Sequence, residues 1–185
     1  YYIYVSPTCG DAWMSTTVTT LVGLQVPYYN DFQTENQGSN ASRGPKNWTL
    51  GNINITAAVG TQTNIPYVYN TAMTGAPTGV EKPNLYFYHS NSATNAGAYA
   101  IMPELLNADV KDLKMSFYGS YNSTTVTANY SKGMLRIGVV ENISDINKTN
   151  AFTKVTEIKT VYCSAPKITE LFTVDFSGYT GNGNR

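Results

Sequence analysis

Apolar and polar residues alternate with a period of two through much of this chain, and this pattern constrains the fold most. In segment 113–118 (LKMSFY) the apolar side chains occupy the odd positions, and segments 135–140 and 172–176 alternate similarly. Successive side chains of a β-strand point to opposite faces, so the alternation predicts strands with one face on a core. The predicted inward set is Leu113, Met115, Phe117, Leu135, Ile137, Val139, Phe172, Val174 and Phe176.

Other β-rich runs cover 15–24, 48–59, 85–88, 99–102, 124–130 and 152–160. Turn-forming Gly, Pro and Asn residues separate them. No segment carries a long apolar stripe of helical period, and 103–110 offers at most one short helical turn. Many short strands with turns between them predict an all-β fold, a two-sheet antiparallel sandwich.

The first fourteen residues differ from the rest of the chain. A five-residue β-former, Tyr1, Tyr2, Ile3, Tyr4 and Val5, is followed by the connector Ser6-Pro7-Thr8-Cys9-Gly10. We predict that 1–14 form a strand and connector, of this domain or of an adjacent unit, and that 15–185 form one domain. Because an extended segment can add to a sheet edge, residues 1–5 are the candidate for strand-mediated assembly.

Charge and composition exclude several classes of protein. The 12 Lys and Arg residues balance 12 Asp and Glu, so no basic excess favours a nucleic-acid partner. The chain is 42% hydrophobic, which is enough to fill a core. No run approaches the roughly 18 apolar residues of a membrane helix, so membrane insertion is not expected.

The two cysteines, Cys9 and Cys163, lie far apart and match no metal-ligand or redox spacing. Two readings stay open. Either both are free buried thiols, or they form one disulfide, which would require an oxidising compartment.

Six segments, in this order, match the motifs of one family: VPYYNDF at 26–32, NWTL at 47–50, AYAIMPEL at 98–105, LKMSF at 113–117, the hairpin motif at 135–155 and FTVDFSGY at 172–179. Together they resemble the cleaved-adhesin, or MAM-like, jelly-roll domains of Bacteroidetes surface and secreted proteins. The resemblance implies a lectin-like jelly roll. It also implies a noncatalytic adhesion or structural module, extracellular or at the cell surface, within a larger bacterial protein.

One departure from the family concerns the closing strands. Family members continue past the motif at 178–183 into two further strands, whereas this sequence reaches Arg185. The resemblance therefore implies a domain that lacks these strands, that uses residues 1–5 in their place, or that shares strands with the next unit of an array. The expected partners are neighbouring domains or copies of the same chain, as in a stalk or filament.

The family also suggests a structural calcium ion. Asp31 is retained, Gln33 stands at the family's Glu position and Glu35 follows. Oxygen ligands suit Ca²⁺, so Asp31, Gln33 and Glu35 are the candidate ligands. The alternative is a solvated strand end.

Tyrosine is abundant, with 15 residues, and Tyr118, Tyr121 and Tyr130 flank predicted strands. Exposed rings can stack on sugar faces, so these three are the candidate ligand-binding residues. The alternative is ordinary amphipathic packing. A carbohydrate-binding module with a discrete glycan site is thus the second functional hypothesis. A glycan or a host surface protein is accordingly a further expected partner.

The sequence offers little for catalysis. The single histidine, His89, precedes Ser90, whose side chain would point to the opposite face of a strand. No Gly-x-Ser-x-Gly motif occurs. Glu141 and Asp145 fall in a predicted loop, so the sequence does not determine the separation that a glycosidase pair would need. We therefore do not expect an enzyme.

Overall fold

The computed structural model describes residues 2–5, 14–17, 23–35, 44–53, 65–79, 82–87, 97–121, 134–147, 150–151 and 153–185. In these ranges the regular secondary structure is β-strand apart from two short 3₁₀ turns, η1 (Val110–Asp112) and η2 (Ile143–Asp145), and the remaining residues form turns and loops. The predicted all-β class is confirmed. Within the same ranges, no helix has the length and apolar character needed to cross a membrane.

In chain order, the strands are β1 (Tyr2–Val5), β2 (Met14–Thr17), β3 (Gly23–Leu24), β4 (Thr49–Ile53), β5 (Tyr67–Tyr69), β6 (Asn84–Tyr86), β7 (Gly97–Ile101), β8 (Glu104–Leu105), β9 (Lys114–Gly119), β10 (Met134–Val140), β11 (Val155–Tyr162) and β12 (Glu170–Asp175). They pair as two-stranded ribbons: β1–β2, β3–β8, β4–β7, β5–β6, β9–β12 and β10–β11. The β3–β8 pair is parallel and the other five are antiparallel.

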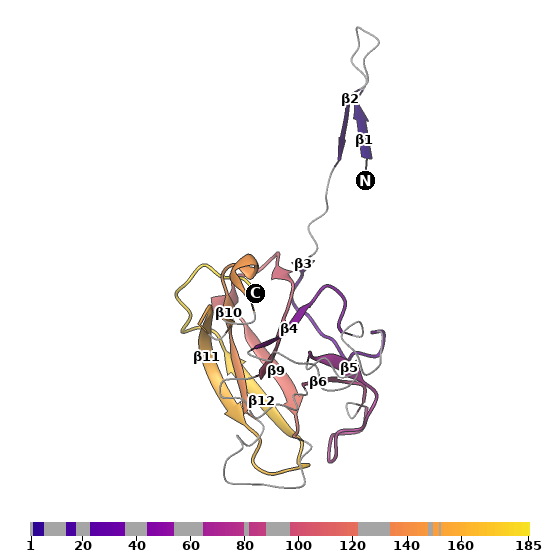
Figure 1. The fold of residues 1–185 in the computed structure, drawn as a ribbon, viewed down its shortest axis with the longest axis vertical. Helices are drawn as coiled ribbons and strands as arrows, with labels where there is room; N and C mark the ends of the chain where they lie inside the picture. Colours follow the sequence, from indigo (N-terminus) through magenta and orange to yellow (C-terminus); the bar gives the residue numbers. More distant parts are fainter. Residues whose placement is uncertain are drawn as a thin grey trace.

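The β9–β12 and β10–β11 ribbons, which lie together in Figure 1, share one hydrophobic core. Its buried members are Val110, Ile137, Val139, Val161, Val174, Phe176 and Tyr179. Met115, Phe117, Leu135 and Phe172 are half-buried against this cluster, and Leu113 is also half-buried. Eight of the nine predicted inward residues, all except Leu113, therefore face the core. Burial of these apolar side chains is the main favourable contribution to folding.

A β-bulge bends the β10–β11 ribbon beside this core. The register shifts between Ile137 and Gly138, so that Ile158 has no opposite residue in the pairing. A Cβ atom at Gly138 would lie 2.5 Å from the carbonyl oxygen of Thr156. Glycine is required at this position because a bulge brings the two backbones too close for a side chain.

The N-terminal strand is present and has a partner in its own chain. β1 pairs with β2 from Tyr2 opposite Thr17 to Val5 opposite Met14, and this hairpin lies apart from the other ribbons in Figure 1. The run predicted at 15–24 thus contributes two strands, β2 and β3. The pairing also joins residues 14–17 to the N-terminal strand, across the boundary predicted after residue 14. A role for residues 1–5 in assembly stays a prediction.

Segment 26–32 resembles a family strand, but it forms a loop here. The backbone of Val26 bonds the Asn107 side chain at both its N–H (2.8 Å) and its carbonyl (3.0 Å). Within the loop, the N–H of Phe32 donates to Asn30 Oδ1 at 2.7 Å, and Phe32 has a positive φ of 59°. Asn side chains compete with strand pairing for backbone groups, which explains why the β-like motif does not form a strand.

Segment 103–110, which could have offered one short helical turn, does not form one. Strand β8 occupies this segment, and η1 begins only at Val110. The N–H of Leu105 donates to the carbonyl of Asn184, and that of Leu106 to Leu24, each at 2.9 Å. These long-range bonds hold the backbone of Leu105 and Leu106 beside Asn184 and Leu24, as part of the β3–β8 pairing region. η1 forms because Asp109 caps it, its Oδ1 accepting from the N–H of Lys111 at 3.1 Å.

A pH-dependent contribution to stability is expected from Asp175. Its carboxylate contacts the Lys114 ammonium at 2.9 Å and accepts from the N–H of Ser177 at 2.9 Å. The Lys114 bond, followed by the Ser177 bonds, lowers the pKa of Asp175 from 3.8 to about 2. A carboxyl group whose pKa is lower in the folded chain than in the unfolded chain stabilises the fold at any pH above the unfolded pKa. This stabilisation is lost as the pH falls from the unfolded pKa through the folded pKa.

Asp175→Asn should therefore lower the melting temperature at neutral pH. Between about pH 4 and pH 2, the melting temperature of the variant should fall less than that of the parent. Both groups are exposed, so the effect is small. Thermal melts of the parent and variant across this range are the measurement. Two curves with a constant separation down to pH 2 would contradict the expected linkage.

Candidate functional site

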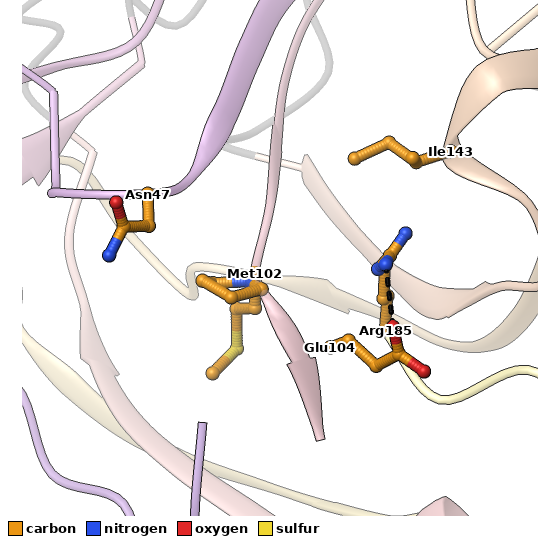
Figure 2. Close-up of a pocket in the computed structure, with 6 residues that line it drawn as sticks. Asn47, Met102, Glu104, Ile143 and Arg185 are labelled. Atoms are coloured by element: carbon orange, nitrogen blue, oxygen red, sulfur yellow. Dashed lines mark hydrogen bonds and ion pairs between the residues drawn. The ribbon is translucent and has the colours of Figure 1, made fainter. Parts of the chain in front are cut away.

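A pocket of about 270 Å³ lies where four distant parts of the chain meet. Asn47 precedes β4, Met102 and Pro103 link β7 to β8, Glu104 begins β8, and Ile143 begins η2. Arg185 completes the lining, which Figure 2 shows. The pocket thus combines an amide, a carboxylate and a guanidinium with three apolar side chains.

An ion pair lies at one side of this pocket. The Arg185 guanidinium donates to Glu104 Oε2 at 2.9 Å, and Asn184 Nδ2 donates to Oε1 of the same carboxylate. The bond from Asn184, assisted by the charge and bond of Arg185, lowers the pKa of Glu104. Glu104 is therefore ionised at neutral pH, and both of its oxygens accept a hydrogen bond.

Residues 179–185, which we call the terminal segment, bring Arg185 to the pocket. Asn184 and Arg185 lie between β8 and the end of β10. The N–H of Leu105 donates to the carbonyl of Asn184, and the N–H of Val140 donates to the carbonyl of Arg185, each at 2.9 Å. Backbone hydrogen bonds thus join Asn184 to the β3–β8 ribbon and Arg185 to the β10–β11 ribbon.

A buried tyrosine anchors the start of the terminal segment. Tyr179 is 4% exposed, and its hydroxyl accepts from the N–H of Gly183 at 2.7 Å and donates to Glu141 Oε1 at 3.3 Å. Burial raises the pKa of Tyr179. A Cβ atom at Gly181 would lie 2.3 Å from this hydroxyl oxygen, so the segment needs glycine to wrap around the ring.

A second pocket, of about 260 Å³, is lined by Glu141, Asn142, Asp145, Thr153, Lys154, Val155 and Thr156. Glu141 and Asp145, whose separation the sequence did not determine, therefore border one pocket. Glu141 also accepts the bond from Tyr179, and Asn142 caps η2 by accepting from the N–H of Ser144 at 3.1 Å. Glu141 and Asn142 thus have structural roles.

The three candidate calcium ligands lie in one loop and bond to neighbouring groups. Asp31 Oδ1 accepts from the N–H of Gln33 at 3.0 Å, and Gln33 Nε2 donates to the carbonyl of Lys82 at 2.9 Å. Glu35 accepts from Asn30 Nδ2 at 3.1 Å and from the N–H of Lys46 at 2.8 Å. Across the described residues, no group of three His, Cys, Asp or Glu side chains could hold a metal. Calcium binding stays a prediction.

The structure does not bring the three candidate tyrosines together as one described surface. Tyr118 is 40% exposed on the outer face of β9, opposite Leu171 of β12, which is 58% exposed. Tyr121 is half-buried, with its carbonyl accepting from the N–H of Lys167 at 2.9 Å. Tyr130 lies outside the described residues. Tyr118 therefore remains the accessible candidate for stacking.

Cys163 is a buried free thiol, and its burial, with the nearby charge of Glu170, raises its pKa. A raised pKa keeps the thiol protonated and poorly nucleophilic. Cys9 lies outside the described residues, as does His89, so the pairing of Cys9 and the setting of the histidine are not described.

Comparison of the chain with protein-family models, curated proteins and solved structures yields no match. The site must therefore be judged on its geometry. Sequence reasoning missed Tyr179, Glu104 and Arg185. The available signal for Tyr179 was the pair of glycines at 181 and 183, because glycine permits a close approach of the backbone to another group.

Proposed function

We propose that this chain is a noncatalytic adhesion or structural module, extracellular or at the cell surface, within a larger bacterial protein. We further propose that its ribbons belong to a jelly-roll sandwich, as the family resemblance implies. The core shared by the β9–β12 and β10–β11 ribbons supports such a packing. The adhesion role is carried by the outer face of the β9–β12 ribbon.

That outer face combines apolar and polar groups on a well-paired ribbon. Tyr118 and Leu171 are exposed opposite each other, and Ser116 and Thr173 share a hydroxyl hydrogen bond at 3.0 Å in the next outward row. Lys114 and Asp175 form an ion pair beyond them. An exposed aromatic and a leucine, flanked by polar groups on a rigid element, suit contact with another macromolecular surface.

A bead-adhesion assay tests this role. Beads coated with the chain should bind epithelial cell monolayers above the level of albumin-coated beads. The double substitution Tyr118→Ser with Leu171→Ser should reduce binding several-fold, because it removes the apolar contacts. The matched control, Ser116→Ala with Thr173→Ala on the same face, should retain it. Binding no greater than that of albumin-coated beads would reject the adhesion role.

The pocket at Glu104 and Arg185 supports the carbohydrate-binding alternative. Its Asn47 amide and its ion pair could bond sugar hydroxyls, while Met102 and Ile143 offer apolar contacts. A glycan array probed with the whole chain separates the alternatives. Saturable binding of one glycan class, abolished by Asn47→Ala and retained in the Tyr118 and Leu171 double variant, would favour the pocket over the outer face.

A further inference from the structure

We propose that the pocket beside the Glu104–Arg185 ion pair binds the acetamido group of an N-acetylated sugar residue. This inference rests on the carbohydrate-binding alternative of the proposed function, and it names the class of sugar that the pocket selects. The pocket volume of about 270 Å³ is just below the range of ~300–1,000 Å³ that is usual for drug-sized ligands. It therefore suits a single sugar ring.

The pocket offers more unused hydrogen-bond donors than acceptors. Arg185 carries several N–H donors and uses Nη2 for its bond to Glu104 Oε2 at 2.9 Å. Both carboxylate oxygens of Glu104 already accept bonds, from Asn184 and from Arg185. Among the residues that the structure describes, neither the other Arg185 nitrogens nor the Asn47 side chain has a hydrogen-bond partner. A ligand with a strong acceptor, such as a carbonyl or carboxylate oxygen, therefore fits better than one with hydroxyl groups alone.

The charge of the lining favours a neutral acceptor over a carboxylate. The Arg185 guanidinium and the Glu104 carboxylate form an ion pair at 2.9 Å, so the two side chains together carry no net charge at neutral pH. A ligand carboxylate placed at Arg185 would lie near the Glu104 carboxylate, and like charges repel. An amide carbonyl accepts from the same guanidinium without this repulsion. The group that the pocket selects is therefore an amide.

The rest of the lining matches the other parts of an acetamido group. Met102, Pro103 and Ile143 supply apolar surface for its methyl group. In Figure 2, Met102 lies between Asn47 and the ion pair, so a methyl group at Met102 has polar groups to either side. Asn47 Oδ1 can accept from the ligand N–H, while the Arg185 guanidinium donates to its carbonyl oxygen. Every part of the acetamido group thus has a matching contact.

Peptides also carry amide groups, but the surroundings of the pocket favour a sugar. An extended peptide is commonly bound through backbone hydrogen bonds to a strand edge. Beside the pocket, the N–H groups of Leu105 and Val140 already donate to the carbonyls of Asn184 and Arg185, each at 2.9 Å. These two donors are therefore not available to a peptide, whereas a sugar residue can be held by side-chain contacts.

Ligand-observed NMR titration of the whole chain tests this selectivity. The sugar probes are the methyl β-glycosides of N-acetylglucosamine, glucosamine, glucose and glucuronic acid, and N-acetylglycine methylamide is the peptide probe. We expect the N-acetylglucosaminide to bind about tenfold more tightly than each of the others, because only it combines the amide bonds with ring contacts. Saturation transfer should be strongest at its acetyl methyl protons. Tighter binding of the glucuronide, or equal binding of the peptide probe, would overturn the proposal.

Two variants link the selectivity to the pocket. Asn47→Asp keeps the side-chain shape and suits the positive φ of 67° at this position. It removes the amide donors and adds a negative charge, so affinity for the N-acetylglucosaminide should fall about tenfold. The control, Tyr118→Ser with Leu171→Ser, changes the outer face of the β9–β12 ribbon and should retain the parent affinity. Unchanged affinity in Asn47→Asp would overturn the proposal. If a variant does not fold, the comparison of probes on the parent chain decides.

Failure of this inference can be told apart from failure of the proposed function. Equal binding of all four sugars, weakened in Asn47→Asp, would overturn the selectivity for the acetamido group and keep a carbohydrate-binding pocket. A chain that binds none of the sugars, but whose coated beads still bind cells, would overturn this inference and leave the adhesion role intact.

Discussion

Replacing Phe176 with alanine is expected to lower the free energy of unfolding by about 3–5 kcal/mol. Phe176 is 9% exposed and packs in the core cluster with Val139 and Val174. Its backbone N–H donates to the carbonyl of Leu113 at 3.1 Å, which holds the main chain in place. The core cannot easily collapse onto the lost ring, so the substitution costs both the transfer free energy and a cavity.

Urea unfolding followed by circular dichroism measures this effect. Leu171→Ala on the same ribbon is the matched control, because Leu171 is 58% exposed and its removal should change stability by about 0.5 kcal/mol or less. Similar losses for the two variants would contradict the described core. Alternation alone predicts the same cost for Phe117→Ala as for Phe176→Ala. Phe117 is only half-buried, so a smaller loss is now expected.

Gly183→Ala is expected to destabilise the chain by about 1–3 kcal/mol, as overpacking does in a buried site. Gly183 is buried, and a Cβ atom there would lie 2.7 Å from both the Tyr179 hydroxyl and Val139 Cγ1. The carbonyl oxygen of Val140 would lie 2.9 Å away. Relief of these contacts requires the terminal segment to move, which would displace Asn184 from Glu104.

Two measurements distinguish this local effect from general damage. Gly178→Ala, where the added atom meets nothing within 4 Å, should leave the urea midpoint nearly unchanged. In Gly183→Ala, NMR titration should show the pKa of Glu104 returning toward its ordinary 4.5, because the bond from Asn184 is the main cause of its lowering. A Glu104 pKa that stays low would mean that Asn184 and Arg185 keep their bonds to Glu104, and would contradict the expected displacement.

The sequence by itself determined the strands of the core and the direction in which their side chains face. β9, β10 and β12 lie at the alternating segments, and the aromatic rings of Phe117 and Phe172 meet across their ribbon at 5.5 Å between centroids. This was predictable because alternation is a local property. A period of two fixes which residues share a face, whichever strand lies alongside.

Only the tertiary structure decided which backbone groups pair over long distances. Asn107 binds both backbone groups of Val26, at the start of the loop 26–32, and the N–H of Leu105 in β8 donates to the carbonyl of Asn184. The pocket arises in the same way, from Glu104 and Arg185, 81 positions apart. Every residue except proline carries the same backbone donor and acceptor, so composition and periodicity cannot specify such partners. Packing of the whole chain chooses among them.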